Sequence, residues 1–214
     1  MTGLDDAYAI EGVEAAAQLY RDWAATYDDD FISATGYQYG HHVARLAMDE
    51  LGSAGGAAVV CDVGCGTGVV AEALVGLGDA LCEGVDLSPE MLEVAGAKVR
   101  SDGAPLYRAL HCVDITVDEM PGGFDAVVSA GTFTFGHLGP EYLEPVVRMA
   151  RSGGVVAIGV NAEFHEERGF GAAVDRLVAE GVLGSPRLEE VPIYTTAPEG
   201  HDHSTAAVIV GRRA

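Results

Sequence analysis

The feature that most constrains the fold is an apolar run that passes directly into a glycine-rich turn. The run, Val59–Val63, contains an acid at Asp62, and a Gly-x-Gly-x-Gly turn follows it over residues 64–68. Glycines let the backbone pass close to a ligand, because they carry no Cβ atom and reach conformations that other residues avoid. A second acid, Asp86, ends the next apolar run 20 residues after Gly66. In folds that bind nucleoside cofactors, an acid at about this spacing binds the ribose hydroxyls.

The rest of the chain alternates short apolar runs with stretches of helical periodicity. This alternation predicts an α/β fold, a mostly parallel sheet with helices on both faces. We expect one domain, 1–214, with an N-terminal helical segment, 1–52, and a Rossmann-like core, 57–214. The expected helices are Val13–Tyr27, Tyr39–Leu51, Val69–Leu77, Pro89–Arg100, Pro140–Met149 and Phe170–Glu180. The expected strands are Val59–Val63, Leu81–Val85, Leu106–Cys112, Phe124–Ser129, Val155–Val160, Leu188–Tyr194 and Ala206–Val210.

Charge limits the partners of this chain. The net charge is −21, and Lys98 is the only lysine among 214 residues. Proteins bind nucleic acids largely by neutralising phosphates with Lys and Arg, so we expect no nucleic acid and no anionic membrane surface as partner. The first residues are acidic where a signal peptide needs cations, and charges interrupt the apolar region Leu51–Cys82. We therefore expect a cytoplasmic protein with no membrane segment.

Two cofactors suit the glycine turn. The spacing Gly66-x-Gly68-x-x-Ala71 satisfies a loose dinucleotide fingerprint, so an NAD(P)-dependent oxidoreductase is one alternative. Asp62 argues against it, because a carboxylate just before the first glycine opposes the pyrophosphate that a dinucleotide places at the helix N-terminus. S-adenosyl-L-methionine carries no phosphate, and its sulfonium and ammonium groups are cationic. We therefore expect S-adenosyl-L-methionine as the cofactor and S-adenosyl-L-homocysteine as its product.

Two motifs carry a resemblance to a known family. The chain reads Asp-Val-Gly-Cys-Gly-Thr-Gly at 62–68 and Gly-Val-Asp-Leu-Ser-Pro-Glu-Met-Leu at 84–92. With both motifs in place it resembles the class I S-adenosylmethionine-dependent methyltransferases, and residues 124–140 further resemble the Williams-Beuren-region methyltransferase-like branch. The resemblance covers the chain from about Tyr20 to Val160. It implies a Rossmann-like sheet of about seven strands with the last antiparallel, helices on both faces and an N-terminal helical lid.

The resemblance also implies which residues bind the cofactor. Gly64 and Gly66 pass under the methionine part, and Asp86 binds the ribose. Leu87 and Met91 flank the adenine, Asp114 accepts a hydrogen bond from its amino group, and the next backbone N–H binds a ring nitrogen. The alternatives are that Leu87 and Met91 belong only to the core and that Asp114 only caps a turn. The residues expected to bind the cofactor are Tyr20, Trp23, Tyr27, Asp62, Gly64, Cys65, Gly66, Gly68, Asp86, Leu87, Met91, Asp114, Ile115 and Ser129.

The acceptor is expected to bind between the aromatic lid and the loop after the fourth strand. His137 lies in that loop and is a candidate general base; a structural role is the alternative. The histidine pairs 41–42 and 201/203 have no matching ligands at metal spacing, so no metal site is expected. The residues expected to bind the acceptor are Tyr37, Thr132, Phe133 and His137.

These observations together predict an enzyme, a methyltransferase that depends on S-adenosylmethionine. It would act on an N, O or C atom of an unidentified small molecule, as a monomer or homodimer. Besides the oxidoreductase, a regulatory module that binds S-adenosylmethionine without catalysis is an alternative, because the fold by itself does not establish the reaction.

Overall fold

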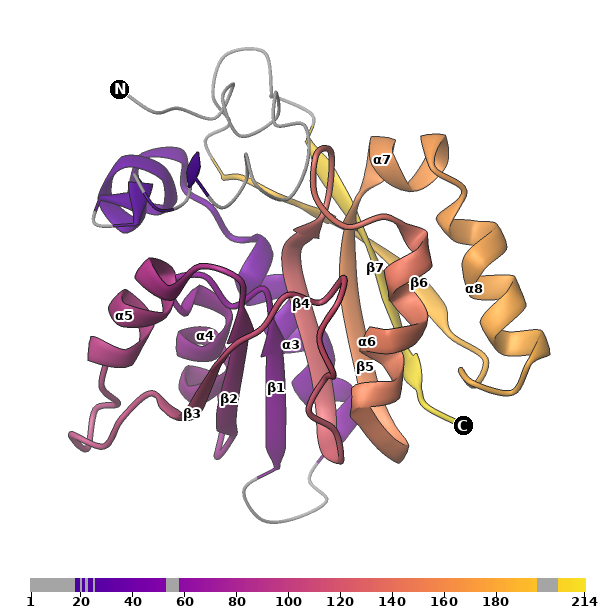
Figure 1. Ribbon diagram of the computed structural model, residues 1–214, viewed down its shortest axis with the longest axis horizontal. Coiled ribbons are helices and arrows are strands. Elements are labelled where there is room, and N and C mark those ends of the chain that lie inside the picture. The colour runs from indigo at the N-terminus through magenta and orange to yellow at the C-terminus, as the bar shows by residue number, and fades with distance from the viewer. Residues whose placement is uncertain (1–17, 20, 22, 25, 53–57, 196–203) are drawn as a thin grey trace.

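The computed structural model describes residues 18–19, 21, 23–24, 26–52, 58–195 and 204–214 (Figure 1). Part of the expected helix Val13–Tyr27 lies outside these residues, and so do Tyr20, His201 and His203. Within the part of the chain that is described, no helix is long and apolar enough to cross a membrane.

Seven strands of the described chain form one mixed sheet in the order β3-β2-β1-β4-β5-β7-β6 (Figure 1). The pairs from β3 to β5 are parallel, and β7 runs antiparallel to both β5 and β6. This arrangement confirms the predicted α/β fold, including the antiparallel last strand. The strands are β1 (Val59–Val63), β2 (Leu81–Asp86), β3 (Tyr107–Cys112), β4 (Phe124–Phe133), β5 (Ala150–Asn161), β6 (Arg187–Pro192) and β7 (Thr205–Arg212).

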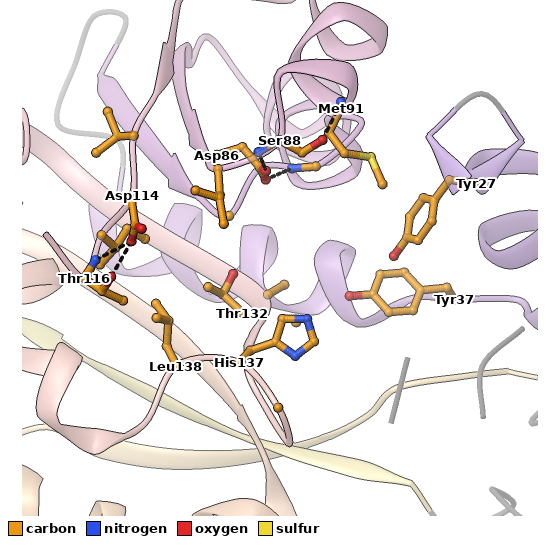
Figure 2. Close-up of a pocket in the computed structure, with 18 residues that line it drawn as sticks. Tyr27, Tyr37, Asp86, Ser88, Met91, Asp114, Thr116, Thr132, His137 and Leu138 are labelled. Atoms are coloured by element: carbon orange, nitrogen blue, oxygen red, sulfur yellow. Dashed lines mark hydrogen bonds between the residues drawn. The ribbon is translucent and has the colours of Figure 1, made fainter. Parts of the chain in front are cut away.

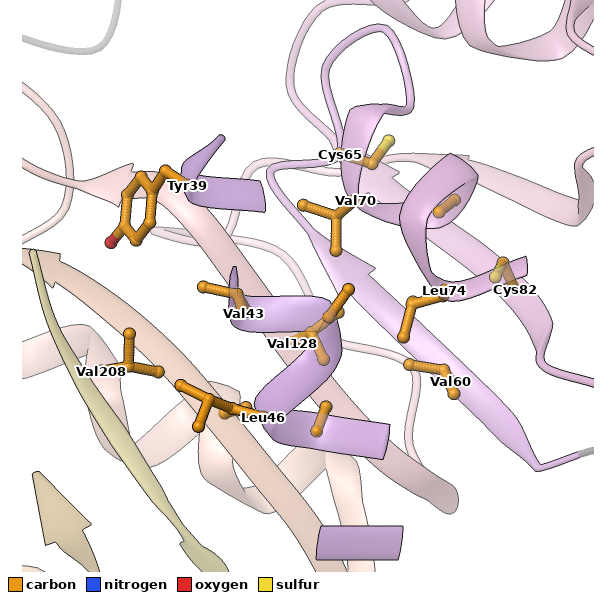
Figure 3. Close-up of a cluster of buried hydrophobic side chains, with 14 of the residues drawn as sticks. Tyr39, Val43, Leu46, Val60, Cys65, Val70, Leu74, Cys82, Val128 and Val208 are labelled. Atoms are coloured by element: carbon orange, nitrogen blue, oxygen red, sulfur yellow. The ribbon is translucent and has the colours of Figure 1, made fainter. Parts of the chain in front are cut away.

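Helices cover both faces of the sheet, because successive residues of its buried strands point to opposite sides. In β1, Val60 belongs to the hydrophobic cluster under α3 and α4, which Figure 3 shows, whereas Cys61 and Val63 belong to the cluster under α6 and α8. The helices are α3 (Tyr39–Leu51), α4 (Val69–Leu77), α5 (Pro89–Ala97), α6 (Leu143–Met149), α7 (Ala162–Glu167) and α8 (Phe170–Ala179), with a π-helix, η1 (Asp28–Ser33), and a 3₁₀ turn, η2 (Pro140–Tyr142).

Several elements depart from their expected bounds. β5 begins at Ala150, five residues before the expected Val155, and the expected helix Pro140–Met149 consists of η2 followed by α6. The helix expected to reach Arg100 ends at Ala97, because Lys98 is extended and Val99 pairs with Pro105 in an isolated bridge. β4 continues past the expected Ser129 to Phe133, with an irregular register against β5 after Ser129. α7 was not expected; the side chain of its N-cap residue, Asn161, accepts a hydrogen bond from a backbone N–H in the first turn.

The segment from 26 to 37, here called the lid segment, lies above the carboxyl ends of the parallel strands (Figure 1). Its aromatic rings pack on one another and on Trp23: the ring centroid of Trp23 lies 5.0 Å from Tyr27 and 5.5 Å from Phe31. At the other end of the lid segment, Tyr37 pairs with Tyr194 in an isolated antiparallel bridge. The lid segment is therefore anchored at both ends by contacts with the rest of the fold.

Candidate functional site

A cavity of about 160 Å³ opens at the carboxyl ends of β1, β2 and β4, under the lid segment (Figure 2). This is the edge at which open α/β sheets bind their ligands. The cavity is lined by Tyr27, Tyr37, Gly64, Gly66, Asp86, Leu87, Ser88, Met91, Val113, Asp114, Ile115, Thr116, Ala130, Gly131, Thr132, Gly136, His137 and Leu138.

The glycine turn follows β1 and forms the floor of the cavity. The backbone N–H of Gly64 donates to the carbonyl of Val85 at 2.8 Å, which joins the turn to the end of β2. Gly64 has φ of 68°, and a Cβ atom there would overlap Oγ1 of Thr132. The positive φ and the close contact with Thr132 both exclude residues that carry a Cβ atom. The backbone of Gly64 therefore lines the cavity directly.

Asp86 ends β2 and holds the turn in place. Its Oδ2 accepts from the backbone N–H of Gly66 at 2.8 Å, and its Oδ1 accepts from the N–H of Ser88 at 2.9 Å. Burial raises the pKa of the Asp86 carboxyl, and these backbone donors oppose that shift. Because a carboxylate has about four lone-pair sites, Asp86 can still accept hydrogen bonds from a ligand in the cavity that it lines.

Asp62 lies below the turn and is fully buried, so it does not line the cavity. Its Oδ2 accepts from the hydroxyl of Tyr107 at 2.7 Å. Burial raises the pKa of Asp62 to about 7, partly offset by the Tyr107 hydroxyl. The prediction that its carboxylate faces a ligand directly stays untested, but the structure places the side chain under the loop that a ligand would touch.

The wall next to β2 and β3 combines apolar side chains with one acid. Leu87 and Met91 line the cavity, and Ser88 caps α5 by accepting from the N–H of Met91 at 3.2 Å. Asp114 lines the cavity as well, while its Oδ1 accepts from the N–H of Thr116 at 2.9 Å and from the Thr116 hydroxyl at 2.6 Å. The turn-capping alternative for Asp114 is therefore present in the structure together with its exposure to the cavity.

The opposite wall brings the lid segment to the loop after β4. In Figure 2 the hydroxyl ends of Tyr27 and Tyr37 point into the cavity, toward the side on which Thr132 and His137 lie. Nδ1 of His137 lies 2.9 Å from the carbonyl of Phe135. Because a carbonyl only accepts, this contact assigns the proton of the neutral imidazole to Nδ1 and makes Nε2 the basic nitrogen.

Burial keeps that imidazole neutral. It lowers the pKa of His137, although the bond to the Phe135 carbonyl acts in the opposite direction. A neutral histidine with a basic Nε2 is the form that can take a proton from a substrate. The candidate general base named from sequence thus lies in the cavity in a protonation state suited to that role.

The charges around the cavity favour a cationic ligand. Among the described residues that line it, Asp86 and Asp114 carry carboxyl groups and none is Lys or Arg. A pyrophosphate normally needs cationic or unpaired N–H partners, whereas a sulfonium or ammonium group gains from nearby carboxylates. No cluster of potential metal ligands occurs among the described side chains.

Besides Asp62, five residues expected at the site lie outside the cavity lining. Trp23 is 3% exposed behind Tyr27, and Ser129 is fully buried with its hydroxyl donating to the carbonyl of Val63 at 2.8 Å. The remaining three are Cys65, Gly68 and Phe133.

Sequence reasoning missed seven residues that also line the cavity: Ser88, Val113, Thr116, Ala130, Gly131, Gly136 and Leu138. Those that lie within the motifs that carried the resemblance are Ser88, Ala130, Gly131, Gly136 and Leu138.

A fold with the cavity at this edge, a glycine turn after β1 and an acid after β2 defines a class. The model of the methyltransferase domain family matches residues 60–154. The chain belongs to the class I S-adenosylmethionine-dependent methyltransferases and is an enzyme of that class. It is similar to human methyltransferase-like protein 27, with 30% identity over 186 residues that cover 82% of this chain and 71% of the human protein. The family resemblance predicted from the sequence is confirmed.

Other relatives match shorter parts of the chain or its fold. The ubiquinone biosynthesis O-methyltransferase of Chromobacterium violaceum is 44% identical over 69 residues, 32% of this chain and 29% of that enzyme. The structure of the N-methyltransferase NodS from Bradyrhizobium japonicum, in complex with S-adenosyl-L-homocysteine, superimposes with a TM-score of 0.65 at 18% identity, covering 92% of this chain and 97% of that one. This second likeness shows the fold.

Proposed function

We propose that this protein binds S-adenosyl-L-methionine in the cavity and transfers its methyl group to a small molecule held between the lid segment and the His137 loop. The observation that carries the proposal is the charge of the cavity: two carboxyl groups and no Lys or Arg among the described lining residues. Such a lining suits a ligand with cationic sulfonium and ammonium groups and disfavours a pyrophosphate.

The residues present fit this cofactor. Gly64 packs against Thr132 and has no side chain, so its backbone is accessible from the cavity. Asp86 supplies oxygens for ribose hydroxyls, and Leu87 and Met91 supply an apolar wall for a purine. When bound, S-adenosyl-L-methionine supplies a methyl group on a positively charged sulfur, already activated for displacement.

The chain then has to align the acceptor, exclude water and, for some acceptors, remove a proton. Tyr27 and Tyr37 cover the acceptor side from the lid segment and reduce access of water to the cavity. Holding two reactants in line can lower the barrier by roughly 7 to 11 kcal/mol. Nε2 of His137, with Nδ1 bonded to the Phe135 carbonyl, takes the proton of an acceptor that enters as a hydroxyl or another weak acid.

The acceptor side also limits the substrate class. With no Lys or Arg lining the described cavity, an acceptor that carries a phosphate or carboxylate has no cation to neutralise it. We therefore expect an uncharged or cationic small molecule as acceptor, with N, O or C as the methylated atom. The similar proteins include an O-methyltransferase and an N-methyltransferase, so they do not decide which atom is methylated. A nucleic acid acceptor is disfavoured by the net charge of −21, and a cytoplasmic location stays a prediction.

Calorimetry with purified protein tests the cofactor. We expect binding of S-adenosyl-L-methionine and S-adenosyl-L-homocysteine and no detectable binding of NAD. Binding of NAD in place of the two methionine derivatives would overturn the proposal in favour of the oxidoreductase.

A labelling experiment separates the enzyme from a regulatory binding module. The protein is incubated with a metabolite extract and S-adenosylmethionine that carries an isotopic label in the methyl group. Transfer of the label to a small molecule supports the enzyme and identifies the acceptor. Tight cofactor binding with no transfer to any fraction of the extract favours the regulatory module.

A further inference from the structure

The single lysine of the chain connects three separate segments. Lys98 follows α5 directly, and its Nζ lies 2.7 Å from Oδ2 of Asp28 in η1 and 2.9 Å from Oε2 of Glu72 in α4. The Lys98 side chain is only 18% exposed, less than either carboxylate partner. An ion pair with a largely covered member is screened less by solvent than a surface pair.

Asp28 is held through both oxygens of its carboxylate. While Oδ2 pairs with Lys98, Oδ1 accepts from the hydroxyl of Thr67 at 2.6 Å. Thr67 is 1% exposed and lies inside the glycine turn, directly after Gly66. We refer to Thr67, Asp28 and Lys98 as the Asp28 network; it bonds the lid segment to the turn under the ligand space and to the end of α5.

Both ends of the Asp28 network lead to residues that line the cavity. On the lid side, Tyr27 precedes Asp28 and lines the cavity. On the turn side, Thr67 follows Gly66, whose N–H donates to the Asp86 carboxylate. The position of Tyr27 over the cavity is therefore linked through short bonds to the loop and acid that the cofactor is proposed to contact.

Charge makes this network sensitive to the loss of Lys98. Without the ammonium group, the carboxylates of Asp28 and Glu72 would face one another across the space that Nζ occupies, in a chain of net charge −21. Two like charges at such a separation repel, so the lysine replaces repulsion with attraction on both sides. A second pair, Arg21 with Glu90 at 3.1 Å, also connects the N-terminal region to α5 but is more exposed.

We propose that Asp28 and Lys98 are positioning residues, whose bonds to each other and to Thr67 hold Tyr27 over the cavity and must break before the cofactor product can leave. This inference rests on the proposed function for its second half, the release of product. Its first half, the position of the lid segment, concerns the protein without any ligand.

Four variants separate the lid contact from the general effect of a lost charge. Asp28→Asn removes the charge on the lid side and leaves Lys98 paired with Glu72. Glu72→Gln is the matched control, because it removes one charge from the same lysine and leaves both bonds of Asp28 in place. Lys98→Met removes both ion pairs of the lysine and leaves the hydrogen bond between Thr67 and Asp28. Lys98→Arg keeps the positive charge and tests rescue.

The chain has one tryptophan, Trp23, and its ring packs against Tyr27 with a centroid distance of 5.0 Å. Quenching of its fluorescence by acrylamide therefore reports how well the lid region is covered, with no other tryptophan in the signal. We expect the quenching constant of ligand-free protein to rise several-fold in Asp28→Asn and Lys98→Met. Glu72→Gln and Lys98→Arg should stay close to the parent, and thermal melting shows that each variant is folded.

Release of S-adenosyl-L-homocysteine measures the second half of the inference. We expect stopped-flow release to be about tenfold faster in Asp28→Asn, which corresponds to about 1.4 kcal/mol. Trp23 protection and release rates that are unchanged in Asp28→Asn, or an equal change in Glu72→Gln, would overturn the assignment. An exposed Trp23 with unchanged release would refute the role in product exchange. If the parent protein does not bind the product at all, the proposed function fails, and the quenching result alone decides whether Asp28 positions the lid segment.

Discussion

Replacement of Asp62 by Asn is expected to stabilise the ligand-free protein at alkaline pH and to have little effect at acidic pH. Asp62 is fully buried, and burial raises its pKa from an ordinary 3.8 to about 7. The folded state therefore binds the proton more tightly than the unfolded state between these two values. It follows that the free energy of unfolding falls as pH rises through this window.

The size of the effect follows from the difference between the two pKa values. A difference of about 3 pKa units at about 1.36 kcal/mol each amounts to about 4 kcal/mol above pH 7 and vanishes below pH 4. Asn keeps one oxygen to accept from the Tyr107 hydroxyl and carries no charge, so Asp62→Asn avoids this cost, although its amide nitrogen cannot accept from the backbone N–H of Ala71, a contact that lowers the pKa of the carboxyl. We expect the variant to be more stable than the parent by several kcal/mol at pH 8 and by much less at pH 5.

Urea denaturation of ligand-free protein at pH 5 and pH 8 measures this difference. Asp125→Asn is the control, because the N–H of Val59 and the Arg151 guanidinium lower the pKa of Asp125. Asp125 is thus ionised in the folded and the unfolded state at both pH values, and the effect of its replacement should not change between them. A stability difference between parent and Asp62→Asn that is the same at pH 5 and pH 8 would refute the reasoning.

Three further predictions concern the cavity. Asp86→Ala removes a carboxylate acceptor and should weaken binding of S-adenosyl-L-homocysteine by about 1.5 to 3 kcal/mol, measured by calorimetry; unchanged affinity in the folded variant contradicts the ribose assignment. His137→Ala should keep cofactor affinity but lower turnover of the identified acceptor by about 100-fold to 10,000-fold if His137 is the base; equal turnover from pH 6 to 9 returns it to a structural role. Gly64→Ala forces a Cβ atom onto Thr132 at positive φ, so the melting temperature and cofactor affinity should both fall, and a variant as stable and as tight as the parent contradicts the close approach.

Much of the fold could be predicted because its signals are local. The periodicity of apolar residues placed Tyr39–Leu51, Val59–Val63 and Val69–Leu77 at the bounds that the structure has. The glycine turn could be recognised because its signal is also local: only glycine fits the positive φ of Gly64 next to Thr132, so the turn shows in the sequence as glycine. The turn and the acid after β2 lie close in sequence to the strands that position them, so spacing alone indicated a ligand site at this edge.

What the sequence could not decide is the direction of each side chain, because direction depends on contacts between distant segments. Spacing placed Asp62 and Asp86 near the carboxyl ends of two adjacent strands. The packing of Tyr107 from β3 buries Asp62, whereas Asp86 lines the cavity. Likewise, only the docking of η1 beside the glycine turn brings Lys98 within 2.7 Å of Asp28. The local pattern of residues determined the strands, the turn and the expected class of cofactor, while burial and long-range packing decided which charged groups line the cavity and which bond the lid segment to the glycine turn.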